Sequence, residues 1–272
     1  FIAFLIGLFS LYYLIPRRFQ WLLLLIADAL FYYCAGWQGL VFMAATVTVA
    51  WASTNLMSSS LAKQKSFLSS PPGKELSREE RKAVKKQGEK YRKRIFILAL
   101  VLDLGILAAL KYTNFVIHNV NSLFGANIAG VDWLLPLGIS FYTFQTVSYI
   151  IDVYWEKTEA EKNILRVALF TSFFPLLIQG PISRFGDLSR TLFAEHEPDF
   201  KQISFGLQRI IWGYFKKLVI ADRLLAAVTT LCGDPTLYTG AYVFFGAMFY
   251  AAELYADFTG GIDITIGIAQ VL

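Results

Sequence analysis

Three carboxyl groups lie close together in strongly apolar sequence near the end of the chain, within FYAAELYADFTGGIDITIGIAQ. They belong to Glu253, Asp257 and Asp263, and the first two are four residues apart, which places them on one face of an intact helix. Two carboxylates that face each other in a low-dielectric environment are unfavourable unless one is protonated or paired with a cation. The pattern therefore predicts a functional site. The alternative is a helix–helix contact at the small residues of the same stretch, Gly260, Gly261 and Gly267.

A second unusual pattern breaks an apolar run with prolines and polar residues, in FFPLLIQGPISRF. Pro175 removes a backbone donor in the middle of the run, and Gly180-Pro181 ends any helix that remains. Irregular backbone at membrane depth is tolerated only where protein or a water-filled cavity satisfies its polar groups. We therefore expect this segment to line a cavity or to form a re-entrant turn, with Gln179 and Arg184 at its rim. A proline-kinked spanning helix is the alternative.

Two further acids, Asp28 and Asp103, lie within other apolar runs, and such residues usually face the interior of a helix bundle. We favour a hydrogen bond to a neighbouring helix for both, with a functional role as the alternative. The two histidines, His118 and His196, are interpreted as ordinary surface residues. The sequence has no phosphate-binding glycine loop, no nucleophile elbow and no cluster of histidines, cysteines and acids at metal spacing, so no metal site is predicted.

The elements that position these residues are predicted from composition. The chain has 272 residues, of which 56% are hydrophobic, and its mean hydropathy is +0.50, which is typical of an integral membrane protein. Several apolar stretches approach the ~17–25 residues that a spanning helix needs. We predict an all-α fold, a polytopic transmembrane helical bundle with a proline-broken or re-entrant segment, in which residues 1–272 form a single domain.

The positive charge is concentrated in one segment, Leu61 to Arg94. This segment holds twelve Lys and Arg against four Asp and Glu, while the whole chain has a net charge of only +5. Nucleic acid is therefore not expected as a partner, and the segment is predicted to be a cytoplasmic loop with the N-terminus outside. Within it, Ser77 and Glu80 have the spacing of a capping box that begins a polar helix. This helix is interpreted as solvated beside anionic headgroups, with docking of an acidic carrier as the alternative.

Four motifs in order resemble the membrane-bound O-acyltransferase (MBOAT) family, most closely its bacterial alginate O-acetylases and teichoic-acid D-alanyl transferases. They are LLPLGISFYTFQTVSYIIDVYW, FFPLLIQGPISRF, WGYFKKLVIADRL and ELYADFTGGIDITIGIAQVL, and they extend from about Trp133 to the end of the chain. The resemblance implies a funnel in which a hydroxyl acceptor meets an acyl donor. Six positions match the family's broken segment: Phe173, Pro175, Gln179, Gly180, Pro181 and Arg184. Gln179, Pro181 and Arg184 are the expected substrate-binding residues.

The resemblance also implies the partners. The acyl donor would be an acetyl thioester, such as acetyl-CoA or a carrier-bound acetyl group, and no bound cofactor is expected. The acceptor would be a polysaccharide or teichoic acid, served by a cytoplasmic acyl carrier and an extracytoplasmic transferase at a bacterial cell membrane. We expect O-acetylation of an extracytoplasmic, alginate-like polysaccharide. D-alanyl transfer to teichoic acid and a transporter or flippase without acyl chemistry are the alternatives.

In one important position the sequence departs from the family pattern. The family depends on a histidine downstream of the segment matched by Asp257 to Leu272, and neither His118 nor His196 matches it. We therefore expect the chain to be C-terminally truncated and inactive alone, with the general base beyond Leu272. Asp257 is the acid expected to support the site, with Asp263 second.

Overall fold

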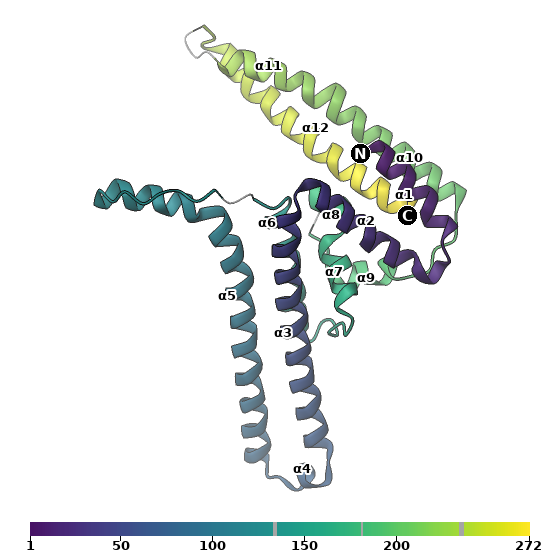
Figure 1. Cartoon of the computed structure of the whole chain (residues 1–272), viewed down its shortest axis with the longest axis vertical. Coiled ribbons are helices and arrows are strands. Elements are labelled where there is room, and N and C mark those ends of the chain that lie inside the picture. The colour runs from purple at the N-terminus through teal and green to yellow at the C-terminus, as the bar shows by residue number, and fades with distance from the viewer. Residues whose placement is uncertain (133–134, 181, 234–236) are drawn as a thin grey trace. The chain divides into compact units, whose positions relative to one another are not determined.

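The chain folds into helices. The computed structural model describes residues 1–132, 135–180, 182–233 and 237–272, apart from the side chains of residues 178 and 179, and these residues contain no strand (Figure 1). The predicted all-α class is confirmed. Among the described residues, three helical segments are long and apolar enough to cross a membrane: Arg17–Ala35, Trp37–Ser69 and Arg78–Phe124. The chain is a membrane protein.

Two compact units make up the fold, and each is described by itself. The hairpin unit comprises Trp21–Phe173 and Ile182–Ala194. The terminal unit comprises Phe1–Gln20, Phe174–Pro181 and Glu195–Leu272. The assignment of residues 1–272 to one domain stays a prediction.

The hairpin unit is built on two long helices, α3 (Trp37–Ser69) and α5 (Arg78–Phe124), which lie side by side (Figure 1). The short helix α4 (Pro71–Glu75) joins them. The prediction of a loop from Leu61 to Arg94 is therefore wrong for most of its length, because both helices continue through the basic sequence. The predicted capping box is confirmed: the Glu80 amide donates to Ser77 Oγ, and the Ser77 amide donates to Glu80 Oε2.

Four further helices belong largely to this unit: α2 (Gln20–Ala35), α6 (Ile139–Tyr154), α7 (Ile164–Ser172) and α9 (Phe185–Leu192). Helix α6 begins only at Ile139, inside the first of the four family motifs. Pro136 lacks a backbone donor, and Gly138 has a φ of 67°, a left-handed conformation that favours glycine, so the helix starts after both. Residues 133 and 134 lie outside the described residues.

The predicted break in the apolar run is confirmed. Helix α7 ends at Ser172, Phe173 is non-helical with φ −50° and ψ 99°, and α8 (Phe174–Gln179) follows. Pro175 lies in the first turn of α8, where its missing donor costs no helical hydrogen bond. The alternative of a single proline-kinked helix is wrong. The prediction that the segment lines a cavity stays a prediction.

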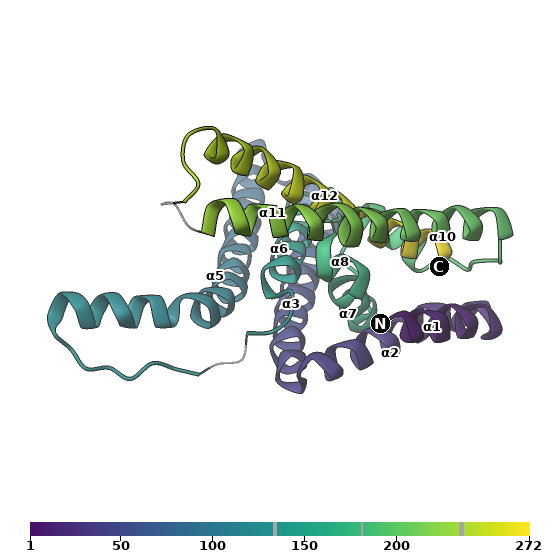
Figure 2. The same cartoon turned by 90° about the horizontal axis from the view of Figure 1, so that it is seen from above.

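The terminal unit holds α1 (Ile2–Leu14), α8, α10 (Phe200–Phe215), α11 (Asp222–Gly233) and α12 (Ala241–Val271). A π-helical turn, Lys216–Ala221, connects α10 to α11. Helices α10 and α11 lie along α12 in both views (Figures 1 and 2). The acids predicted from the C-terminal sequence are therefore carried by one uninterrupted helix that packs on its neighbours.

Candidate functional site

The two predicted supporting acids, Asp257 and Asp263, both lie on α12 and are paired with cations. Asp263 Oδ1 accepts a hydrogen bond of 2.9 Å from Arg209 Nε, and Asp263 Oδ2 accepts one from Lys216 Nζ. Asp257 Oδ1 accepts one from Lys217 Nζ. The cations come from α10 and from the π-helical turn that follows it. Two of the three clustered carboxylates are therefore each paired with a cation, which offsets the cost of placing charge in apolar surroundings.

Glycines allow α12 to approach α10 closely enough for these pairs. A Cβ atom on Gly213 would lie 2.6 Å from the Gly260 carbonyl oxygen, and one on Gly267 would lie 2.7 Å from the Gly206 carbonyl oxygen. The two contacts are seven residues apart on each helix, with the helices antiparallel. Small residues at such a seam are typical of helix packing in membranes. The alternative reading of this stretch, a helix–helix contact, is thus confirmed for Gly260 and Gly267.

Sequence reasoning missed the partners of these acids. It did not single out Gly206, Gly213 or Arg209, and it did not assign Lys216 and Lys217 to the acids. A signal was present, because the stretch WGYFKKLVIA carries two adjacent lysines in otherwise apolar sequence, where unpaired cations are costly. Their natural partners were the acids of the other helical motif.

The ion pairs of Asp257 and Asp263 suit a structural role more than proton transfer. A carboxylate held by a lysine or an arginine is a poor proton acceptor, because the cation favours its ionised form. Asp257 and Asp263 are therefore suited to hold α12 against α10 and the π-helical turn. Glu253 lies one turn before Asp257 and forms no ion pair in the part of the chain that the structure describes. A supporting role for Asp257 and Asp263 in catalysis stays a prediction.

Arg184 lies in the hairpin unit, at the N-cap of α9. Its Nη1 lies 3.3 Å from Asp152 Oδ1 on α6. The Asp152 side chain is only 6% exposed, whereas that of Arg184 is 58% exposed. The next residue, Phe185, packs on α6 and α7, with its ring centroid 4.5 Å from that of Tyr149 and 5.0 Å from that of Phe170. The polar end of the broken segment is thus anchored to α6, and the Arg184 guanidinium remains accessible.

The other two predicted substrate-binding residues cannot be placed. The side chain of Gln179 and the whole of Pro181 lie outside the described residues. Arg184 belongs to the hairpin unit, and Asp257 and Asp263 belong to the terminal unit. The hairpin unit thus contains the Arg184–Asp152 ion pair, and the terminal unit contains the ion pairs of Asp257 and Asp263.

Of the two remaining buried acids, one has the predicted hydrogen bond. Asp28 Oδ2 accepts a hydrogen bond of 3.0 Å from Ser172 Oγ, which joins α2 to the last residue of α7. Asp103 on α5 is fully buried, but neither of its carboxyl oxygens has a hydrogen-bond partner among the described residues. The buried hydroxyl groups of Tyr142 and Thr143 on α6 also lack one there. The prediction is confirmed for Asp28. For Asp103 it stays a prediction, with Thr146 on the neighbouring helix α6 as the candidate donor.

The interpretation of both histidines as ordinary surface residues holds only for His118, which is exposed on α5. His196 is half-buried, and its Nδ1 lies 2.8 Å from the Tyr12 hydroxyl group. Its backbone amide donates to Gln20 Oε1, and its carbonyl oxygen accepts from Gln20 Nε2. Burial lowers the pKa of His196 below its usual value. The residue therefore holds the loop before α10 against α1.

Comparison with known proteins finds several O-acetyltransferases that are similar in sequence to this chain. No family model matches it. The probable alginate O-acetylase AlgI of Azotobacter vinelandii is 35% identical over 274 residues, which cover 97% of this chain and 48% of the relative. AlgI of Pseudomonas aeruginosa is 34% identical, over 97% of this chain and 46% of the relative. The peptidoglycan O-acetyltransferase of Helicobacter pylori is 28% identical over 208 residues, which cover 67% of this chain and 40% of the relative. The chain spans about half the length of the curated relatives it matches, and it belongs with them to the membrane-bound O-acyltransferase family.

Proposed function

We propose that this chain is part of a membrane O-acetyltransferase that acetylates an extracytoplasmic, alginate-like polysaccharide at a bacterial cell membrane. One observation carries the proposal: proteins named as alginate O-acetylases are 33–35% identical to the chain over 97% of its length. The helical, apolar fold is consistent with an enzyme of the bilayer.

The proposed reaction transfers an acetyl group from a thioester, either acetyl-CoA or a carrier-bound acetyl group. The hydroxyl oxygen of the acceptor forms a bond to the acetyl carbonyl carbon, and the carbon–sulfur bond breaks. The hydroxyl proton passes to a general base and then to the departing thiolate. We propose that the base is a histidine beyond Leu272. His196 is not proposed, because its Nδ1 is hydrogen-bonded to the Tyr12 hydroxyl group and the residue holds a loop in place.

The residues of this chain would then support the reaction indirectly or bind substrate. Asp257 and Asp263 would fix α12 through their lysine and arginine partners. Arg184 has an exposed guanidinium that is anchored on one side by Asp152, a geometry suited to orienting an anionic group of donor or acceptor. Gln179 and Pro181 are proposed as further substrate-binding residues on the basis of the family motif alone.

The proposed topology follows from the charge distribution. The basic segment from Leu61 to Arg94 would be cytoplasmic and the N-terminus external. A cytoplasmic acyl carrier and an extracytoplasmic transferase are proposed as partners, because the donor and the acceptor would then be on opposite sides of the membrane.

The experiment is disruption of the gene in its own host, followed by NMR measurement of ester-linked acetyl groups on secreted polysaccharide. We expect the acetyl esters to be lost and to return on complementation, with the polysaccharide itself still exported. Loss of D-alanyl esters from teichoic acid, with acetyl esters intact, would instead support D-alanyl transfer. Loss of the exported polysaccharide itself would support a transporter or flippase.

Peptidoglycan is a second candidate acceptor. The Helicobacter pylori relative, named as a peptidoglycan O-acetyltransferase, matches 67% of this chain. The same strain comparison tests it when cell-wall muropeptides are also analysed. Acetyl loss confined to muropeptides would replace alginate-like polysaccharide as the proposed acceptor.

A further inference from the structure

Two adjoining cavities lie in the hairpin unit, near the end of the α3–α5 helical pair. Their volumes are about 510 and 590 Å³, and both are lined by Leu61, Lys65, Arg92 and Glu156. The larger extends along α3 and α5, and the smaller is also lined by the segment that connects α6 to α7. Together they are called the basic cavity here.

The lining of the basic cavity carries six basic and three acidic side chains. The basic residues are Lys65, Arg81, Lys85, Arg92, Lys157 and Lys162. Lys65 is paired with Glu156 at 2.8 Å, and Arg81 donates to backbone carbonyl groups. Lys157 and Lys162 form no ion pair within the described ranges, and the Lys157 ammonium lies 4.9 Å from the Trp155 ring centroid. The protein itself thus leaves an excess of positive charge in the cavity.

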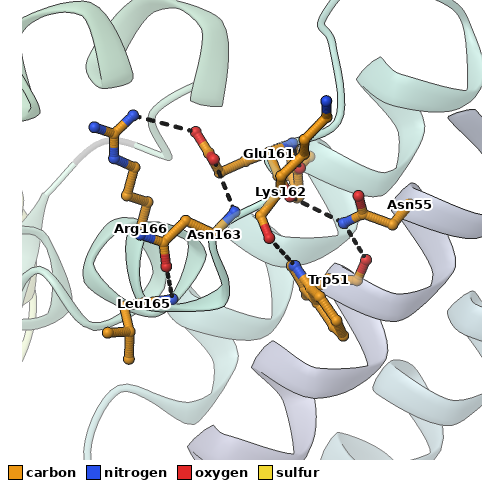
Figure 3. Close-up of polar contacts among 8 residues, drawn as sticks. Trp51, Asn55, Glu161, Lys162, Asn163, Leu165 and Arg166 are labelled. Carbon is orange, nitrogen blue, oxygen red and sulfur yellow. Dashed lines mark hydrogen bonds and ion pairs between the residues drawn. The ribbon is translucent and has the colours of Figure 1, made fainter.

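The lysine-bearing segment is held in place, as Figure 3 shows. Trp51 Nε1 on α3 donates to the Lys162 carbonyl oxygen at 2.9 Å, and Asn55 Nδ2 donates to the Glu161 carbonyl oxygen at 2.9 Å. The Glu161 amide donates to the Tyr149 hydroxyl oxygen at 2.8 Å, which joins the segment to α6 as well. These bonds use backbone groups of the segment and leave the Lys162 ammonium free to reach a ligand. A site whose backbone is already ordered binds at a lower entropic cost.

The cavity also has a directed guanidinium and an apolar wall. Arg92 on α5 donates from Nη1 to Gln64 Oε1 at 2.7 Å, which orients its planar group at the boundary of the two volumes. Met57, Leu61 and Val153 line the smaller cavity beside it. An oriented arginine with nearby lysines matches the oxygens of a phosphate group, and the apolar wall suits an attached carbon chain.

We propose that the basic cavity is a binding site for a phosphate-bearing ligand with an alkyl or amide chain. Two sources have this chemistry: a soluble phosphorylated acyl donor and the headgroup of an anionic phospholipid. The first source rests on the proposed function, whereas binding of phosphate itself does not. A direct binding experiment therefore distinguishes failure of this inference from failure of the proposed function.

The test uses the full chain in nanodiscs of phosphatidylcholine, with calorimetric titration of inorganic pyrophosphate and, separately, of coenzyme A. The variant is Lys157→Gln/Lys162→Gln. The control is Lys82→Gln/Lys86→Gln, which makes the same charge change at exposed positions of α5 outside the cavity lining. We expect the cavity variant to weaken binding by about tenfold or more, because hydrogen bonds between charged groups are stronger than those between neutral groups and the variant removes two charged donors. The control should change it little.

A second arm examines phospholipid. Nanodiscs of phosphatidylcholine with added phosphatidylglycerol are analysed for lipid that stays bound to the protein in native mass spectrometry. Retention of phosphatidylglycerol that depends on Lys157 and Lys162, without pyrophosphate or coenzyme A binding, would support the phosphate site and assign it to lipid. Equal weakening by the cavity and control variants, or no binding in either arm, would overturn the proposal.

Discussion

At the scale of single residues, Arg184 and Asp152 form an ion pair whose partners differ in burial. The Asp152 side chain is only 6% exposed, so water cannot stabilise its charge and the Arg184 guanidinium must do so. The Arg184 side chain is 58% exposed, so its own charge is stabilised by water as well. Removing one partner of such a pair leaves a buried charge uncompensated, which costs more than the pair contributes. An effect of Arg184 on activity must therefore be separated from its effect on stability.

We expect Arg184→Ala to destabilise the protein by about 1–3 kcal/mol, since it leaves the Asp152 carboxylate without its cation. The measurement is thermal unfolding in detergent together with protein abundance in membranes. Arg184→Ala/Asp152→Asn should recover most of the stability, because the buried charge is then removed. If the double variant is stable and polysaccharide acetylation is still lost, Arg184 acts on substrate. Recovery of acetylation with stability would limit it to a structural role.

His196 gives a prediction about pH. Its pKa is lowered by burial, so the folded state binds a proton less readily than the unfolded state, in which the pKa is about 6.5. Its contribution to stability is therefore full above about pH 6.5 and is lost as the pH falls below that value. The melting temperature should drop between pH 7 and pH 5 more steeply for the wild type than for His196→Asn. If the melting temperatures of the two proteins change with pH in the same way, the pKa of His196 does not differ between the folded and the unfolded state.

At the scale of elements, α10 and α12 depend on glycine for their separation. The carbonyl oxygen of Gly260 occupies the space that a side chain on Gly213 would need. The ion pairs of Asp257 and Asp263 join α12 to α10 and to the π-helical turn that continues it, so a wider separation would also stretch the Arg209 and Lys217 contacts. Packing and charge pairing are thus coupled along one pair of helices.

Gly213→Val is expected to destabilise the protein by about 1–3 kcal/mol or more through overpacking. The matched control is Gly105→Val on α5, where an added Cβ atom would meet no atom within 4 Å. Thermal unfolding of the two variants in the same detergent checks the difference. A Gly213→Val protein as stable as the control would mean that the seam relaxes without cost.

Much of this element structure was predictable from the sequence, and the exceptions have physical causes. The break before Pro175 and the Ser77 capping box follow from local rules and were found. The polar start of α5 was predicted from the capping box, but the extension of α3 to Ser69 and the continuity of α5 into its apolar part were missed, because charged residues with good helix propensity fit a solvated helix as well as a loop. The cation partners of Asp257 and Asp263 were missed because they are about 40 residues or more away along the chain. Pairing of that kind depends on which helices pack together.

At the scale of the whole molecule, charge is distributed unevenly between the helical segments that are able to span a membrane. The basic residues gather where α3 ends, at α4 and where α5 begins, which are joined in one continuous polar region of the hairpin unit. Positive charge of this kind is retained on the cytoplasmic side during insertion. The proposed phosphate site lies in the same region, so its access to cytoplasmic ligands depends on this orientation.

Site-directed labelling tests the orientation. Ser69 is exposed at the last residue of α3, and both natural cysteines, Cys34 and Cys232, are exposed, so they are first replaced by serine. In that background Ser69→Cys should resist a membrane-impermeant thiol reagent in intact cells and react after permeabilisation, because the basic region would be cytoplasmic. Gln38→Cys, near the opposite end of α3, is the matched control and should react in intact cells. Reaction of Ser69→Cys in intact cells, with protection of Gln38→Cys, would reverse the topology and place the basic cavity outside the cytoplasm.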